Sequence, residues 1–191
     1  MAGFVEPPWA NPLDAARVVQ QIPAGATIAG MFFLALVEGA QRRQVELPFP
    51  RERYLPFGFY PISEFAPLLV TAAERFYPEL PLRQGLRRIG TSGPVAFLGS
   101  TLGKVTLGAS EGAHAMVAAI AKTYAINVKP SRCDITETNE RSMILRMEGV
   151  PYFLDSHHVG VFEGTLHYAG VEGTVLIQSY SDSAADLRLS W

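Results

Sequence analysis

Cysteine is almost absent from this chain: Cys133 is the one cysteine among 191 residues. A single cysteine can form neither an internal disulfide nor a cysteine-based zinc cluster, and this usage is typical of a reducing cytoplasm. An excess of charge is missing too, because 16 basic residues against 18 acidic ones leave a net charge of −2. Such a balance argues against electrostatic binding to nucleic acid. We therefore expect a cytoplasmic protein that binds no nucleic acid.

Long apolar runs are also missing. The longest one, Ile28 to Val37, is half of what a membrane-spanning helix needs. The N-terminus lacks the basic flank that precedes the apolar run of a signal peptide. What is present is a globular composition, 48% hydrophobic and 18% charged, which supports a sizeable core. We expect one domain without a membrane segment.

Proline marks off the start of the chain. Residues 1–13 contain three prolines, which exclude a helix there. We predict an extended N-terminal arm over residues 1–22 and a single domain over residues 23–191. Trp9 in the arm is a candidate for docking on a partner chain.

Apolar side chains recur at helical spacing over the first two thirds of the chain. We predict helices over residues 27–43, 63–77, 81–89, 94–107 and 111–124. The first of these rests on the length of its apolar run and on Glu38 and Arg42, which lie four residues apart. Ser63 is placed to cap the second of these helices, and Gly90 to end the third. Arg83 and Arg87, one turn apart, are expected on the outer face of the third helix.

The hydrophobic pattern changes from helical spacing to alternation after Pro130. Residues 131–138 and 142–148 alternate as strands of a hairpin, and two more strands are expected at about 174–179 and 186–191. Between these pairs we predict a helix that Asp155 or Ser156 caps and that ends at Gly170. The order predicts an α+β domain in which N-terminal helices pack on a four-stranded antiparallel sheet, in the order helices-ββαββ.

Few patterns carry chemistry. The string GSTLGK at residues 99–104 has the wrong glycine spacing for a phosphate-binding loop and follows no strand. The serines lack the nucleophile-elbow motif of serine hydrolases. Cys133 lies in a predicted strand, where a small apolar filler is the expected role.

The segment around His157 and His158 is the richest in polar groups. Adjacent histidines point about 100° apart on a helix, so they do not share one metal ion by spacing alone, and no metal site is expected. Glu163 falls at the edge of the apolar stripe, where an arginine such as Arg132 or Arg146 would pair with it. Gly160 and Gly164, four residues apart, allow another backbone to approach this helix closely.

Two resemblances follow from these segments. Over about residues 22–191, the chain resembles a large uncharacterised paralogous family of myxobacteria. The resemblance rests on the strings GMFFLALVEGAQRR, RERYLPFGFYPISEFAPLLVTAAERFYPELPLRQGLRRIG, STLGK and YFLDSHHVGVFEGTLHYAGVEG. That family has no established activity, so the likeness implies no function.

The second resemblance concerns architecture. The C-terminal order of helix, two strands, a Gly-x-x-x-Gly helix and two strands resembles haem–nitric oxide/oxygen-binding domains, and also the 4-vinyl-reductase-type and vesicle-tethering proteins of that fold. In the haem-binding members an axial histidine precedes the first strand, which implies His114 as the haem ligand here. Their Tyr-x-Ser-x-Arg string for the haem propionates is missing, and the nearest stretch, residues 152–156, reads YFLDS.

We interpret the chain as a non-catalytic cytoplasmic sensory, regulatory or scaffold module that binds a small hydrophobic ligand or a protein partner, with homodimerisation as one form of partner binding. No acid, base, nucleophile or metal set converges in the sequence, while the apolar fraction leaves surface for a ligand cavity. The candidate pocket walls are Phe32, Leu36, Phe65, Leu69, Met116, Ile120 and Phe162. No cofactor is favoured. The alternatives are a haem-based gas sensor that uses His114, and an enzyme that uses Glu163, His157 or His158.

Overall fold

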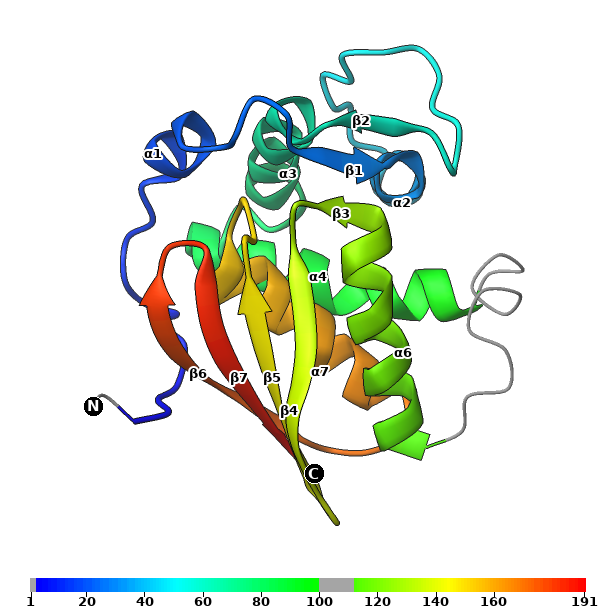
Figure 1. Ribbon diagram of the computed structural model, residues 1–191. Coiled ribbons are helices and arrows are strands. Elements are labelled where there is room, and N and C mark those ends of the chain that lie inside the picture. The colour runs from blue at the N-terminus through cyan, green and yellow to red at the C-terminus, as the bar shows by residue number, and fades with distance from the viewer. Residues whose placement is uncertain (1–2, 100–111) are drawn as a thin grey trace.

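The computed structural model describes residues 3–99 and 112–191 and has the expected α+β architecture (Figure 1). Its helices are α1 (Ala15–Gln20), α2 (Gly30–Arg43), α3 (Ile62–Phe76), α4 (Leu82–Gly99), α6 (Gly112–Asn127), a π-helical turn η1 (Leu154–His158) and α7 (Val159–Tyr168). Its strands are β1 (Thr27–Ala29), β2 (Phe59–Pro61), β3 (Val128–Lys129), β4 (Arg132–Asn139), β5 (Ser142–Glu148), β6 (Thr174–Ser181) and β7 (Ala184–Ser190).

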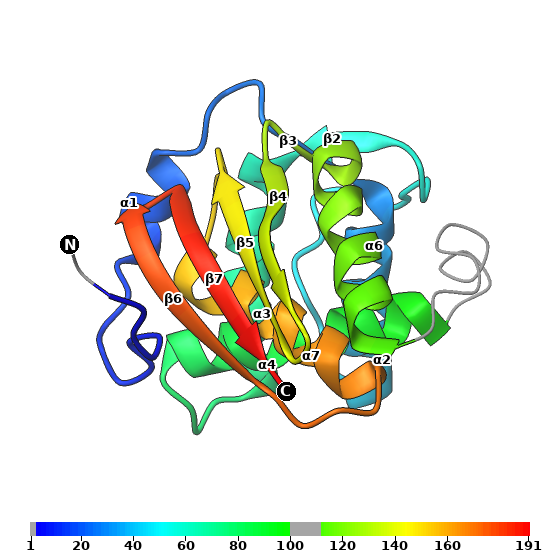
Figure 2. The same ribbon diagram turned by 60° about the horizontal axis from the view of Figure 1, so that its bottom comes forward.

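The main sheet has four antiparallel strands in the order β4-β5-β7-β6, and the sequence predicts four such strands. Leu145 of β5 faces Leu187 of β7 in the register, and both side chains are fully buried. Helix α7 lies against one face of this sheet, α4 packs on α7, and α6 runs beside β4 (Figures 1 and 2). The alternation of each strand therefore directs one row of apolar side chains toward the helices.

A second, three-stranded sheet in the order β2-β1-β3 is not expected from the sequence. Residues 27–29, predicted as the first turn of a helix, instead pair with residues 59–61 and 128–129. Local periodicity cannot reveal a pairing between segments so distant in the chain. The helix α2 then begins at Gly30, where a Cβ would lie 2.2 Å from the carbonyl oxygen of Leu55.

Helix α4 corrects the prediction of two helices separated at Gly90. It runs without a break from Leu82 to Gly99, with Pro94 inside it. Gly90 does not end a helix: a Cβ at this position would lie 2.1 Å from the carbonyl oxygen of His157. The glycine is needed for contact between two segments. Residues 100–107 of the predicted fourth helix, and residues 100–104 of GSTLGK, lie outside the described residues.

The close approach expected at Gly160 and Gly164 is present between α7 and α4. A Cβ on Gly160 would lie 2.2 Å from the carbonyl oxygen of Arg87, and one on Gly164 would lie 2.2 Å from that of Thr91. Backbone therefore packs directly on backbone along this pair of helices. Together with Gly90, these residues set the distance between α4 and the segment from η1 to α7.

Two predicted caps are wrong. Helix α3 begins at Ile62 without a side-chain cap, so Ser63 lies inside its first turn. The segment after β5 begins with η1, and Asp155 there forms an ion pair with Arg83 of α4 instead of capping a helix. Arg83 and also Arg87 therefore face the η1–α7 segment, in contrast to the outer face expected for them.

The N-terminal arm lies along the outer strand of the main sheet (Figure 2). Val5 forms an antiparallel bridge with Ile177 of β6, and the Trp9 ring lies 4.2 Å from the guanidinium carbon of Arg87. Trp9 thus packs on its own chain. Helix α1 falls inside the predicted arm of residues 1–22, so that segment is not extended throughout; the domain boundary itself stays a prediction.

Replacement of Gly164 by alanine is expected to lower the free energy of unfolding by about 1–3 kcal/mol, because the added methyl group overpacks against the α4 backbone. Urea unfolding measures this change. Gly93→Ala is the matched control, since a Cβ on Gly93 meets nothing within 4 Å and alanine favours the helix by about 0.5–1 kcal/mol. Equal stability of the two variants would contradict the backbone packing described here.

Candidate functional site

A cavity of about 320 Å³ lies between helices α2 and α3 on one side and α4 and α6 on the other. Most of its wall is apolar. Side chains that contribute to it include Ala35, Phe65, Leu69, Phe76, Ile89 and Val161. Ligand pockets in proteins span about 300–1,000 Å³ and are lined mainly by such side chains, so the space suits a small molecule.

Most of the predicted pocket residues reach this cavity. Phe32 and Leu36 of α2, Phe65 and Leu69 of α3, and Ile120 of α6 line it.

Two of the predicted residues are not among its lining. Met116 is half-buried elsewhere on α6, and Phe162 is fully buried, with its ring stacked on that of Tyr124. The role of the seven residues in ligand binding stays a prediction.

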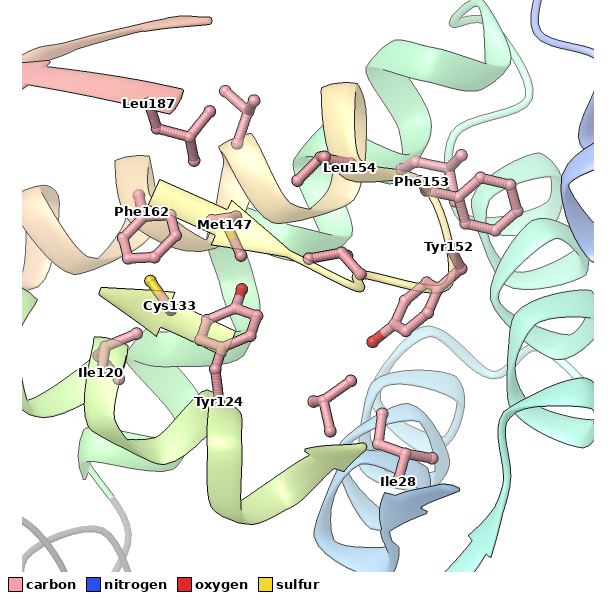
Figure 3. Packing of buried hydrophobic residues seen from close by; sticks show 14 of the residues in the cluster. Ile28, Ile120, Tyr124, Cys133, Met147, Tyr152, Phe153, Leu154, Phe162 and Leu187 are labelled. Atoms are coloured by element: carbon pink, nitrogen blue, oxygen red, sulfur yellow. The ribbon is translucent and has the colours of Figure 1, made fainter. Parts of the chain in front are cut away.

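One part of the wall is polar. Six polar residues line it there. They are Thr123, Tyr124 and Asn127 of α6, and Tyr152, His157 and His158 from the segment that follows β5. Figure 3 shows Tyr124 extending from α6 toward Phe162 and Met147, while Tyr152 enters the same buried region from the end of β5. The π-helical turn brings the two histidines to this place. We call these six residues the polar wall.

The histidines of the polar wall have unsatisfied ring nitrogens. His158 Nδ1 lies 2.9 Å from the Tyr124 hydroxyl oxygen. Neither His158 Nε2 nor His157 Nδ1 has a hydrogen-bond partner among the described residues, and the two side chains are 1% and 8% exposed. Buried polar groups in folded proteins are nearly always paired, so unpaired atoms beside a cavity point to a missing partner.

Burial keeps the polar wall neutral. It lowers the pKa of His157 to about 4 and the pKa of His158 well below its ordinary value, since a charged ring is costly away from water. The neighbouring His157 lowers the pKa of His158 further. Burial also raises the pKa of Tyr124 and of Tyr152. Near pH 7 these four groups are therefore hydrogen-bonding but uncharged.

Charged residues line the cavity only near the C-terminal end of α2, among the described residues. Glu38 and Arg42 there are exposed and form a loose ion pair of 4.0 Å. The Arg43 guanidinium donates a hydrogen bond to the Tyr77 hydroxyl at 3.0 Å and lies over the Phe76 ring. The site thus has a charged rim and an uncharged interior.

The residues of the enzyme alternative do not converge. Glu163 accepts two hydrogen bonds of 2.6 and 2.7 Å from the Arg87 guanidinium, so Arg87 is its partner, in place of the expected Arg132 or Arg146. Arg146 pairs instead with Asp186. Glu163 is not among the residues that line the cavity. Within residues 3–99 and 112–191, no group of three metal-binding side chains occurs.

His114 also lies away from the cavity. Its Nε2 is 2.8 Å from the backbone oxygen of Asn139, and its ring packs edge-on against Trp191. Cys133 is buried, and burial raises the pKa of its thiol to about 12, as suits a structural side chain.

Sequence reasoning misses the polar wall as a unit. It considers His157 and His158 only as metal ligands or catalytic groups. The available signal is their place in a segment that is otherwise almost wholly apolar, VPYFL before them and VGVF after them, which indicates burial of both rings. Their contact with Tyr124 of α6 depends on the fold.

The His157 pKa predicts acid sensitivity. The pKa of His157 is about 4 in the folded chain and about 6.5 in the unfolded chain. Between these two pH values the unfolded chain therefore binds more protons than the folded chain does. The stability that is present above about pH 6.5 is lost as the pH falls towards 4. Between pH 7 and pH 5, His157→Gln should lose about 2 kcal/mol less free energy of unfolding than the wild type. Urea titrations at both pH values test this. A loss in His157→Gln as large as that of the wild type would refute the assignment.

The fold has well-defined structural neighbours. An Fe(II) unliganded H-NOX protein from K. algicida aligns with a TM-score of 0.63 and 13% identity, over 85% of this chain and 96% of that chain. An H-NOX protein from S. oneidensis in the Fe(II)NO ligation state aligns with a TM-score of 0.56 and 12% identity, over 85% of this chain and 98% of that chain. A mutant of T. Tengcongensis H-NOX aligns with a TM-score of 0.54 and 12% identity, over 92% of this chain and 94% of that chain. At this identity the likeness shows the fold alone, and it extends well beyond the C-terminal half for which it is expected.

None of the described helices has the length and apolar character to cross a membrane. No curated protein matches the sequence. A family profile, described as "Protein of unknown function (DUF2378)", matches residues 21–191, close to the range expected for a family of unknown activity. The chain therefore belongs to the DUF2378 family of proteins of unknown function, built on an H-NOX-like fold.

Proposed function

We propose that this chain is a non-catalytic sensory or regulatory module that holds a small, mainly hydrophobic molecule in the cavity between α2, α3, α4 and α6. The observation that carries the proposal is the cavity itself, about 320 Å³ with largely apolar walls, beside a continuous buried core. Burial of apolar surface drives the binding of such a ligand, with about 25 cal/mol for each Å² removed from water.

The size and walls of the cavity restrict the ligand. A volume of about 320 Å³ is at the lower end of the range for ligand sites, which favours a molecule of one or two small rings or a short chain. The apolar side chains come from several helices that are distant in sequence. A ligand here touches α2, α3, α4 and α6 together, so a ligand that binds one packing of these helices more tightly than another would shift the balance between the two.

Haem binding through His114 is the main alternative. The structural neighbours are described in terms of Fe(II), NO and haem, but the residues present here do not fit that arrangement. His114 Nε2 already faces a backbone oxygen, and His114 does not line the cavity. The chain also lacks the Tyr-x-Ser-x-Arg string. We therefore do not assign a haem to this site.

Other expectations stay predictions. An origin among myxobacterial paralogues, a kinship with 4-vinyl-reductase-type domains, a cytoplasmic location, a protein partner and a homodimer each require their own test. An enzyme remains disfavoured on geometric grounds, since the Glu163 carboxylate is held by Arg87 and does not line the cavity with the two histidines.

Ala35→Phe tests the cavity directly. Ala35 lines the cavity from α2, so the added ring occupies ligand volume, and we expect binding of the neutral apolar probe 1-methylnaphthalene to weaken about tenfold or more. Probe fluorescence measures the affinity. Ala115→Phe adds the same bulk on the exposed face of α6 and should bind as the wild type does. Absence of probe binding by the wild type, or equal binding by both variants, would overturn the proposal.

A spectrum tests the haem alternative. When the purified chain is titrated with haemin, we expect no change in the Soret band that depends on His114, because the imidazole is directed toward Asn139 and Trp191. The comparison is between the wild type and His114→Ala. A sharp Soret band of the wild type that this substitution abolishes would restore His114 as an axial ligand.

A further inference from the structure

We propose that the ligand of this cavity carries a hydroxyl group that hydrogen-bonds the unpartnered ring nitrogens of His157 and His158, and is thus a small alcohol or phenol. The inference rests on the proposed function and specifies the chemistry of its ligand. It arises from the polar wall, which a purely apolar ligand would leave unsatisfied.

The two histidine rings lie next to each other in the wall of the cavity. Their centroids lie 5.2 Å apart with planes at 81°, so the unpaired Nδ1 of His157 and Nε2 of His158 belong to neighbouring groups on one wall. Both residues line the cavity and both are more than nine-tenths buried. One polar group of a ligand can therefore lie beside both rings while the rest of the ligand contacts apolar side chains.

The hydrogen-bonding capacity of these rings selects the polar group of the ligand. A neutral imidazole offers one donor and one acceptor, and the tautomer decides which nitrogen is which. A hydroxyl has one proton to donate and two lone pairs that accept, so one ligand hydroxyl satisfies both orphan nitrogens when at least one of them carries a proton, and donates to one of the two when both are bare. The side chain of Tyr152, which lines the same wall, adds a further hydroxyl with this double capacity.

The uncharged polar wall disfavours ionised ligands. A buried carboxylate or ammonium needs an opposite charge beside it, and none of the six residues of the polar wall is charged near pH 7. The arginines that line the cavity within the described residues, Arg42 and Arg43, belong to its rim at the end of α2. Buried water can also satisfy orphan nitrogens, so the experiment must separate a ligand hydroxyl from water.

The test compares 1-naphthol with 1-methylnaphthalene, two probes of similar shape that differ in one hydroxyl. Fluorescence of the naphthalene ring gives the affinity of each probe, and the ratio of the two affinities is the measured quantity. The double variant His157→Gln/His158→Asn removes polar atoms from the two orphan positions, because glutamine reaches the place of Nε2 and asparagine that of Nδ1. We expect the preference for 1-naphthol to fall about tenfold in this variant, the effect of one hydrogen bond.

The opposite pair, His157→Asn/His158→Gln, is the matched control. It keeps polar atoms near the two orphan positions and should retain most of the preference. 1-Naphthoate, which is charged at pH 7, should bind more weakly than 1-naphthol to the wild type. Circular dichroism and thermal unfolding confirm that each variant is folded before affinities are compared.

The outcomes separate two failures. If neither 1-naphthol nor 1-methylnaphthalene binds the wild type, the proposed function fails and this inference fails with it. If both bind with a ratio that the double variant leaves unchanged, the cavity binds ligands but water satisfies the histidines, and this inference alone is wrong. Equal loss of the preference in both double variants would likewise contradict it, since the histidines would then act only through packing.

Discussion

The structure depends on a backbone-to-backbone contact between α4 and the segment from η1 to α7. Three glycines make this contact, because a Cβ at Gly90, Gly160 or Gly164 would collide with a carbonyl oxygen of the other segment. The contact fixes the place of η1, and η1 carries His157 and His158. The polar wall of the cavity is therefore positioned by residues that have no polar side chain of their own.

Charge pairs reinforce the same contact at its margin. Arg87 of α4 holds Glu163 of α7 with two hydrogen bonds, and Trp9 of the N-terminal arm lies over the Arg87 guanidinium. Arg83 forms an ion pair with Asp155 one turn earlier. The carboxylates of these pairs do not line the cavity, whereas the two histidines do. The same local geometry thus separates structural charges from the neutral site.

The fold is predictable where short-range patterns determine it. Alternation in residues 142–148 identifies a strand, and the spacing of Gly160 and Gly164 indicates close helix packing. The prediction at Gly90 is wrong because a glycine after an apolar helical stripe commonly ends a helix. Here the same residue provides room for the His157 carbonyl oxygen, a contact between positions far apart in sequence. Strand β1 is not predictable for the same physical reason, because the two strands that pair with it lie far away in the sequence.

The site is only partly predictable. Helical periodicity identifies Phe65 and Leu69 as inward-facing, but it cannot tell a side chain in a filled core from one beside a cavity, because both are apolar and buried. The partner of Glu163 cannot be found from the sequence, since several arginines satisfy the same requirement. His157 and His158 are recognisable as unusual. Their neutral state depends on burial, which a sequence indicates only through its apolar neighbours.

Likeness of fold does not carry the function of the neighbours to this chain, because function resides in particular side chains. Structural neighbours at 12–14% identity share the arrangement of helices and strands. In this chain a pair of uncharged imidazoles lies beside an apolar cavity, and the His114 ring faces the backbone oxygen of Asn139. A buried neutral wall selects against ions and for hydrogen-bonding neutral molecules, whatever the ancestry of the fold. The chemistry that we propose for the ligand therefore rests on the polar wall and its burial, and not on the fold.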